Sequence, residues 1–410
     1  SPISFGALVG DNCSEFFDPV RKTPMHDWAA DNGAVFEDVG QWKRARYYPR
    51  MGEGLDQAVQ REAKAVRANC GLLDASTLGK IDVQGPDAAE FLNRIYTNAY
   101  TNLGVGRCRY GLMLDENGMV FDDGVVARLG DKHFHLTTTT GGAARVYAWL
   151  ERWLQTEWQN LKVFCTSVTE QWATMTVSGP AARSVVSMVV DPNQIGPVEL
   201  PHMGVVSTDI AGVPGRIFRI SFTGEISFEL NVPADYGAHV WDTVIEAGKH
   251  HNLVLYGTET MHLLRAEKGF IIVGQETDGS VTPQDLGMDW IVSKKKYDFI
   301  GLRSLSRRNM MRPDRRQLVG LETDDPSITL EEGVHVVEDA PVAPQTPMLG
   351  HVTSSYFSPN LGRSIALGLL KGGKSLAGRQ LFALSLEGEP ISLRVVGPCF
   401  LDPEGSRLHG

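Results

Sequence analysis

The chain has 410 residues, a net charge of −10 and a hydrophobic fraction of 42%. This length predicts two or three domains, and the acidic balance argues against a nucleic-acid binder, which normally carries a basic surface. No run reaches the ~20 apolar residues of a membrane-spanning helix, and residues 1–6 lack the basic and apolar regions of a signal peptide. We therefore expect a cytoplasmic globular protein that binds neither membranes nor nucleic acids.

The sequence shows no pattern for a disulfide framework or a metal site. Its five cysteines are scattered and form no Cys-x-x-Cys pair, the spacing that zinc sites commonly show. His133 and His135 lie two apart and His250 and His251 are adjacent, but no acids stand at metal-ligand spacing from them. We expect the protein to bind no metal.

An internal repeat follows residues 1–21, which we interpret as an N-terminal arm or connector. Residues 80–89 and 173–182 each show an alternating strand, a Gly-Pro turn and the start of a helix. The expected elements are helices at 88–96, 143–157, 181–189, 237–249 and 258–268 and strands at 125–128, 134–138, 217–222 and 228–232. This order predicts an α+β fold of duplicated ferredoxin-like units around a crevice.

A hairpin in the first unit carries two adjacent acids. Asn117-Gly118 is a strong two-residue turn signal, so residues 111–114 should pair with residues 119–126. Successive side chains of a strand point to opposite faces, so Asp122 and Asp123 cannot easily serve one site together. We expect one acid to face a cavity, where burial would raise its pKa and suit it to accept a proton. The other should meet a cap, an ion pair or water; a solvent-exposed pair remains the alternative from this window alone.

From about residue 316 short alternating strands replace the mixed pattern. They are expected at 317–322, 335–337, 349–356, 364–370, 381–386 and 391–396. Gly, Pro and Asn turns separate them, which predicts an all-β barrel or sandwich. The basic stretch 294–316 just before it is interpreted as a solvated linker, or as a patch for an anionic ligand tail or an acidic partner subunit. The predicted domains are an arm at 1–21, a region at 22–310 and a barrel domain at 311–410.

Six short motifs occur in one order within residues 22–408. They lie at residues 107–114, 122–123, 222–229, 264–269, 282–290 and 350–355. Each is weak alone, but the ordered set resembles the folate-dependent aminomethyltransferases, the T-protein family of the glycine cleavage system. The resemblance implies a tetrahydrofolate-binding region in the T-protein fold, followed by a β-barrel domain.

Four further segments resemble a narrower group, the C-terminal half of the α subunits of heterotetrameric sarcosine oxidases. They lie at residues 33–44, 74–80, 137–142 and 256–262. In those subunits this half follows a dinucleotide-binding half, whose Gly-x-Gly-x-x-Gly fingerprint does not occur here. The resemblance implies a flavin-bearing β subunit and small subunits as partners. It also implies FAD, FMN and NAD in the assembled complex, mainly outside this chain.

The resemblance also implies roles for single residues. Asp123 matches the catalytic acid that approaches N10 of tetrahydrofolate during one-carbon transfer. Glu229 matches the acid that binds the pterin amino and ring N–H groups, which a carboxylate can accept in a planar, bidentate way. Thr139 matches a pterin-contacting position that is usually Asn, and Tyr110 and Trp290 are expected to wall the ring by stacking.

Four other residues in or near these motifs are not expected to take part in the transfer reaction. Asp122 lies on the opposite strand face from Asp123, so we expect a structural role for it. Arg265 and Glu267 are expected to form a structural ion pair. Met261 stands where T-proteins carry an Arg, which implies that recognition of the folate tail differs.

The function implied by the resemblance is one-carbon transfer within a sarcosine oxidase. A flavin in the partner subunit would oxidise sarcosine to an imine, which this chain would capture on tetrahydrofolate. The products would be glycine, 5,10-methylenetetrahydrofolate and hydrogen peroxide, with formaldehyde released in the absence of folate; the pocket must exclude water because the imine hydrolyses. The alternatives are a stand-alone folate-dependent aminomethyltransferase or demethylase, and a non-catalytic folate-docking module.

Overall fold

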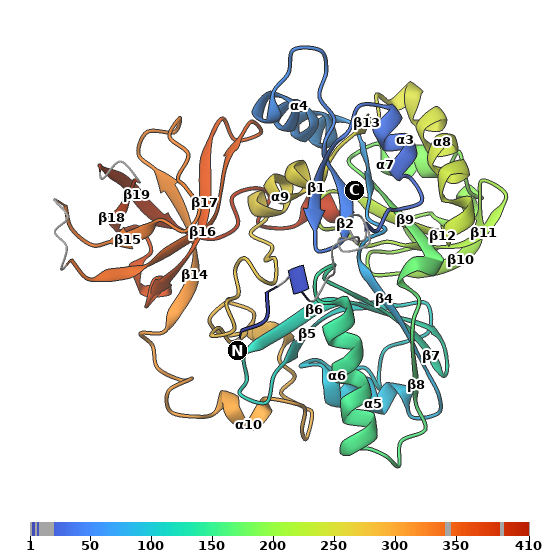
Figure 1. Ribbon diagram of the computed structural model, residues 1–410, viewed down its shortest axis with the longest axis horizontal. Helices are drawn as coiled ribbons and strands as arrows, with labels where there is room; N and C mark the ends of the chain where they lie inside the picture. Colours follow the sequence, from blue (N-terminus) through green and yellow to red (C-terminus); the bar gives the residue numbers. More distant parts are fainter. Residues whose placement is uncertain (1, 5, 8–19, 341–345, 386–388, 410) are drawn as a thin grey trace.

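Two sheets and a closed barrel form the three lobes of the computed structural model (Figure 1), which describes residues 2–4, 6–7, 20–340, 346–385 and 389–409. Most of the predicted arm at 1–21 lies outside the described residues. Among the residues described, none of the helices combines the length and apolar character that crossing a bilayer requires.

The first sheet contains five strands in the order β5-β6-β7-β4-β8. Their bounds are β4 (Gly79–Gln84), β5 (Cys108–Leu114), β6 (Val120–Gly130), β7 (His133–Thr138) and β8 (Phe164–Ser167). Two helices, α5 (Ala88–Ile95) and α6 (Ala143–Thr156), pack on one face of it. Helix α5 turns Ala88, Phe91, Leu92 and Ile95 inward, the i, i+3, i+4, i+7 spacing of an amphipathic helix.

The second sheet repeats the first. Its order is β10-β11-β12-β9-β3-β13, which matches the first sheet strand for strand once β3 is set aside. The bounds are β3 (Gly71–Asp74), β9 (Trp172–Ser178), β10 (Val205–Ile210), β11 (Val213–Phe218), β12 (Ser227–Pro233) and β13 (Val254–Leu255), with helices α7 (Ala182–Val186) and α8 (Gly237–Gly248). The predicted duplication and α+β class are therefore confirmed.

The two sheets turn their polar faces toward each other. On the outer faces, alternate residues such as Ile81, Leu136, Met175 and Leu230 pack against the helices. The residues between them point inward, and the ring of His135 in the first sheet lies 5.8 Å from that of Phe218 in the second. Strand alternation thus creates a layer between the sheets that is rich in charged and hydrogen-bonding groups.

The third lobe is the predicted barrel. It closes in the order β14-β17-β16-β15-β18-β19, so no strand edge is left unpaired. The bounds are β14 (Arg316–Thr323), β15 (His335–Val337), β16 (Met348–Ser358), β17 (Arg363–Lys371), β18 (Gln380–Leu384) and β19 (Pro390–Val396). All six strands were expected from sequence, and the end of the fifth, residue 386, lies outside the described residues.

Some local predictions were wrong or missing. The strand expected at 217–222 ends at Phe218, because the chain leaves the sheet toward the turn at Gly224, whose φ is +81°. The helix expected at 181–189 ends at Val186. The helices and strands without a sequence-based prediction are α3 (His26–Asp31), β1 (Val35–Val39), β2 (Trp42–Tyr47), α4 (Leu55–Ala68), β3, β8, β10, β13, α10 (Leu302–Leu305) and α11 (Ser406–His409).

Buried ion pairs join the barrel to the sheets. Helix α9 (Thr258–Glu267) carries Arg265, which pairs with Glu276 at 2.7 Å and donates to the Ser354 hydroxyl of β16 at 2.6 Å. From the same helix, Glu267 pairs with Arg67 of α4 at 2.7 Å. Arg265 and Glu267 are therefore structural, as expected, but each pairs with another partner rather than with each other.

The basic stretch 294–316 divides into tied and exposed cations. Arg315 pairs with Asp285 at 2.6 Å and Arg316 with Asp278 at 3.0 Å, while Lys296 donates to the Tyr96 carbonyl at 2.5 Å. Three of the nine cations therefore fasten the loop before the barrel to its neighbours. The exposed cations are Lys294, Lys295, Arg303, Arg307, Arg308 and Arg312.

Candidate functional site

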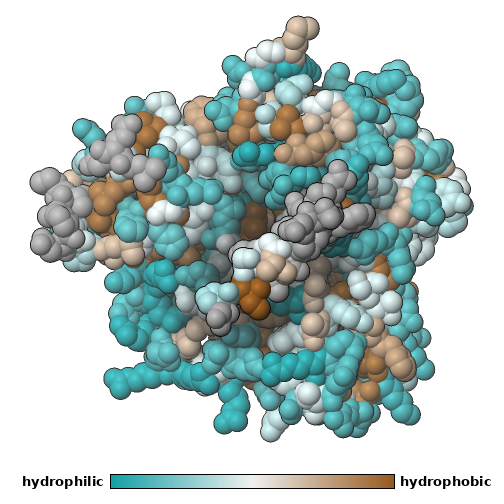
Figure 2. All heavy atoms as spheres, viewed as in Figure 1, coloured by the Kyte–Doolittle hydropathy of each residue, from teal (hydrophilic) through white to brown (hydrophobic). Residues whose placement is uncertain are grey.

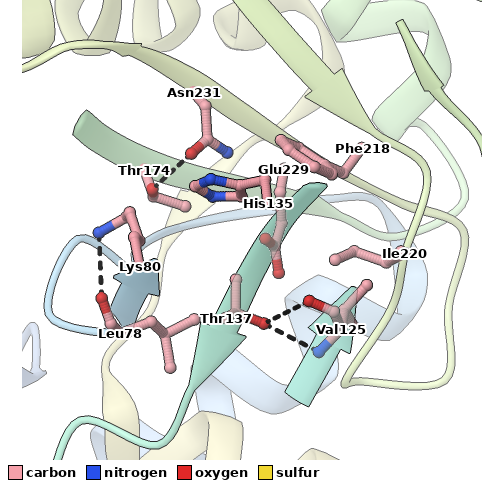
Figure 3. Close-up of a pocket in the computed structure, with 10 residues that line it drawn as sticks. All are labelled: Leu78, Lys80, Val125, His135, Thr137, Thr174, Phe218, Ile220, Glu229 and Asn231. Atoms are coloured by element: carbon pink, nitrogen blue, oxygen red, sulfur yellow. Dashed lines mark hydrogen bonds between the residues drawn. The ribbon is translucent and has the colours of Figure 1, made fainter. Parts of the chain in front are cut away.

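A narrow cavity lies in the polar layer between the two sheets (Figure 3). Its walls come from strands of both repeats: Leu78, Lys80, Val125, His135, Thr137, Thr174, Phe218, Ile220, Glu229 and Asn231. The face seen in Figure 2 is hollowed near its centre, between the barrel and the sheet lobes, with apolar atoms at the floor of the hollow. Polar groups converge on the cavity from facing strands within a largely apolar frame, but at about 10 Å³ it is far smaller than the usual binding site for a small molecule.

Glu229 provides the carboxylate of this cavity. It lies on β12 between Thr176 of β9 and Phe218 of β11, and its side chain points into the cavity (Figure 3). Among the described residues it accepts no hydrogen bond; burial raises its pKa to about 7, and the charge of Lys80 opposes that rise. A buried acid without a protein donor is costly when ionised, so Glu229 is poised to accept N–H donors from a ligand.

Lys80 provides the cation. Its side chain is 1% exposed, and its Nζ donates to the carbonyls of Ser76 at 2.7 Å, Leu78 at 3.1 Å and Thr169 at 3.3 Å. Burial lowers its pKa to about 8. Three carbonyl acceptors match the three N–H groups of an ammonium, so this side chain is held in one place as a charge.

A histidine and an arginine complete the polar layer. The His135 Nδ1 lies 2.6 Å from Asp82 Oδ1, and burial lowers the pKa of His135 to about 4, which keeps its ring neutral. Arg216 is 5% exposed and stacks on the Trp172 ring at 3.7 Å, but its Nε and Nη2 find no partner among the described residues.

Asp123 lies on the same face of β6 as the cavity. Val125, two residues further along the strand, lines the cavity, so the Asp123 carboxylate lies about 7 Å along the strand from it. The Tyr110 hydroxyl donates to Asp123 Oδ2 at 2.6 Å. Burial raises the pKa of Asp123 to about 7, with the Tyr110 hydrogen bond opposing the rise. This acid can therefore gain and lose a proton near neutral pH.

Asp122 occupies the opposite face, as alternation predicted, and its contacts are structural, as expected. Its side chain is 0% exposed and accepts from the N–H of Asp123 at 2.8 Å and from the N–H and hydroxyl of Thr139 at 3.2 and 3.0 Å. A Cβ on Gly142, just before α6, would lie 1.8 Å from Asp122 Oδ2. Asp122 thus fixes the chain at the start of α6, where glycine lets the carboxylate approach.

We expect Asp122→Ala to lower the free energy of unfolding by about 2–3 kcal/mol, because it leaves buried N–H groups without an acceptor. Urea denaturation would measure the change. Asp122→Asn keeps one oxygen acceptor and should cost less. Equal stability of the alanine variant and the wild type would contradict the structural role.

Of the residues selected from sequence, Glu229 lines the cavity, whereas Tyr110 and Asp123 contact each other on the inner face of the first sheet without lining it. The Thr139 hydroxyl is used by Asp122 and by the N–H of Gly142 at 3.1 Å. Trp290 on η5 (Asp289–Ile291) is 72% exposed and does not line the cavity.

Lys80 and His135 were missed as site residues. The sequence carried a signal for them, because residues two apart in a strand lie on the same face. One strand has Lys80 and Asp82, and another has His133 and His135, on the face opposite the apolar residues.

Comparison with known proteins places both parts of the chain. Residues 25–296 match the GCVT N-terminal domain, and residues 316–402 match the glycine cleavage T-protein C-terminal barrel domain. The chain has the fold of aminomethyltransferase T of the glycine cleavage system from Bartonella henselae, with a TM-score of 0.81, 24% identity and coverage of 94% of this chain and 99% of that one.

Two curated relatives illustrate the range of similarity. The sarcosine oxidase subunit alpha of Corynebacterium sp. (strain P-1) is 52% identical over 100% of this chain, but the chain spans only 42% of that subunit. An aminomethyltransferase from Thermotoga neapolitana is 28% identical over 86% of this chain and 90% of its own length. These similarities confirm the resemblance read from the sequence motifs, and the chain belongs to the glycine cleavage T-protein family, with a GCVT N-terminal domain followed by a T-protein C-terminal barrel domain.

Proposed function

We propose that this chain is the folate-dependent, one-carbon-transfer part of a sarcosine oxidase α subunit. The observation that carries the proposal is the Glu229 carboxylate, which points into a cavity between the duplicated sheets and accepts no hydrogen bond from the described part of the chain. The 52% identity to a sarcosine oxidase α subunit over the full chain supports the choice of enzyme. The residues present fit tetrahydrofolate, because its pterin edge offers the N–H donors that Glu229 lacks.

Each inner-face residue has a distinct task in this proposal. Glu229 binds the pterin amino and ring N–H groups, and Asp123 accepts a proton from the reacting nitrogen. Tyr110 orients Asp123 through the 2.6 Å hydrogen bond and offers its ring as a wall. Tetrahydrofolate, when bound, supplies the nitrogen that accepts the one-carbon unit. Thr139 acts through Asp122, and the exposed Trp290 receives no task in the cavity.

The substrate is the imine that a flavin-bearing partner subunit forms from sarcosine. Its capture gives glycine and 5,10-methylenetetrahydrofolate, the flavin gives hydrogen peroxide on reoxidation, and formaldehyde is released when folate is absent. The chain spans about two fifths of the curated α subunits, so FAD, FMN and NAD are assigned mainly to other parts of a heterotetramer. A buried layer between the sheets favours transfer because it keeps water from the imine.

We expect Glu229→Gln to weaken tetrahydrofolate binding about 10- to 100-fold, because hydrogen bonds to a charged acceptor contribute about 1.5–3 kcal/mol. Isothermal titration calorimetry of the full chain would measure the dissociation constants. Glu246→Gln is the matched control, since the Glu246 side chain is 71% exposed and lies near the end of α8. Unchanged affinity in Glu229→Gln would remove Glu229 from the site, and no binding to the wild type would overturn the proposed function.

A stand-alone aminomethyltransferase is the second candidate. It is favoured by the alignment that covers 90% of the Thermotoga neapolitana enzyme, since that enzyme is matched nearly whole. Purification from the native source distinguishes the two: flavin-bearing subunits should accompany a sarcosine oxidase α subunit and be missing from a stand-alone transferase.

A further inference from the structure

We propose that Lys80 is a positioning residue of the folate cavity, whose fixed ammonium holds Glu229 in the carboxylate form that accepts the pterin N–H groups. The inference rests on the proposed function and deepens it. It begins from two charged side chains that line the same cavity from facing sheets, Lys80 on β4 and Glu229 on β12 (Figure 3).

The hydrogen bonds of Lys80 exclude a direct role as a ligand group. Its three N–H groups are matched by the carbonyls of Ser76, Leu78 and Thr169, so none is free for the pterin. No salt bridge to a carboxylate joins this side chain among the described residues. Its positive charge therefore acts without a salt bridge, first on the buried Asp74 and then across the cavity on Glu229.

Among the described residues, Lys80 is the charged side chain that acts on the pKa of Glu229. The titratable or charged neighbours are His135 on β7, Cys108 on β5, Tyr256 beside β13 and Arg216 on β11. Burial lowers the pKa of His135 to about 4 and raises the pKa of the Cys108 thiol and the Tyr256 phenol, so all three are neutral near pH 7. The Arg216 guanidinium stacks on the Trp172 ring. Trp172 lies four residues along β9 from Thr176, the residue that pairs with Glu229 in the sheet.

Removing the Lys80 charge should shift the pH dependence of binding. Burial raises the pKa of Glu229 to about 7 even with Lys80 present. Without that cation the carboxylate becomes harder to ionise, so binding should begin at higher pH by roughly one pH unit. At pH 7 this corresponds to about a five-fold smaller ionised fraction and a similar loss of affinity.

The test measures tetrahydrofolate binding to the full chain by calorimetry between pH 5.5 and 9. The variants are compared with the wild type below pH 8, because burial lowers the pKa of Lys80 to about 8 and the wild type keeps most of this charge only below that pH. Lys80→Gln removes the charge and keeps two N–H donors for the carbonyls, while Lys80→Arg keeps the charge. We expect the binding midpoint to move about one pH unit upward in Lys80→Gln and to stay near the wild-type value in Lys80→Arg. A merely structural role for Lys80 would weaken binding equally at all pH values and would overturn the inference.

Two further measurements separate the possible outcomes. In a Glu229→Gln background the remaining titration belongs to Asp123, and adding Lys80→Gln should not move it; a shift there contradicts coupling to Glu229. In the unsubstituted chain, the 15N resonance of the Lys80 ammonium should follow the protonation of Glu229, and its independence of pH near 7 would overturn the inference without any variant. If the wild type binds no tetrahydrofolate, the proposed function fails first.

Discussion

Asp123→Asn lowers the formation of methylenetetrahydrofolate by about 10²- to 10⁴-fold, the usual loss when a general base is removed. Sarcosine-dependent peroxide formation in the assembled oxidase should keep its wild-type rate, because the proposed function assigns the oxidation to the partner subunit. Parallel assays of peroxide and of methylenetetrahydrofolate would measure the two rates. The expected result is therefore an uncoupling of the two products rather than a general loss of activity.

The pH dependence of transfer should follow the same carboxylate. Burial raises the pKa of Asp123 to about 7, and only the ionised form accepts a proton. The ionised fraction is about one tenth at pH 6 and about nine tenths at pH 8, so transfer in the wild type should rise over this interval. At saturating tetrahydrofolate, where the titration of Glu229 does not limit binding, the Asn variant has no titrating group at this position and should lose that rise.

Glu116→Gln is the matched control for Asp123→Asn. Glu116 lies in the turn of the same hairpin, but its side chain is 50% exposed and, within the described residues, pairs with Arg152 at 3.8 Å. Its substitution should leave both products unchanged. Equal losses of peroxide and methylenetetrahydrofolate in Asp123→Asn would show that the carboxylate supports the assembly and not the transfer.

The hairpin shows how far sequence reasoning reaches. The Asn117-Gly118 turn and the two-residue period of a strand place Asp122 and Asp123 on opposite faces, and the structure has them so. What covers each face depends on elements distant in sequence. The start of helix α6 packs against Asp122 and buries it completely. The sequence predicted the face of this acid, but not which element would cover it.

Lys80 illustrates the same limit at the candidate site. Its strand pattern assigns it to the polar face of β4, but that face is a cavity wall only because a second sheet lies opposite. The carbonyls of Ser76 and Thr169 that hold its ammonium come from outside β4. Trp290 is the converse case: it lies within a motif that resembles the family, yet its loop leaves it exposed.

The attachment of the barrel depends on a charge pair that is removed from water entirely. Arg265 and Glu276 are each 0% exposed. Glu276 also accepts from the hydroxyls of Thr353 at 3.0 Å and Ser354 of β16, and from the N–H of Ile272 at 2.8 Å. The pair therefore binds α9 and the following loop to the barrel through one network, in which each charge depends on its partner.

Arg265→Met should lower the free energy of unfolding by about 3–5 kcal/mol, because it leaves Glu276 as a buried charge without a counterion. Urea denaturation would measure the loss, and Arg265→Met with Glu276→Gln should recover part of it, since the second change removes that unpaired charge. Lys249→Met is the control: its partner Glu246 is exposed, and such surface pairs contribute about 0–1 kcal/mol. If both methionine variants lost the same small amount, the buried pair would contribute no more than a surface contact, and the barrel would be held by apolar packing instead.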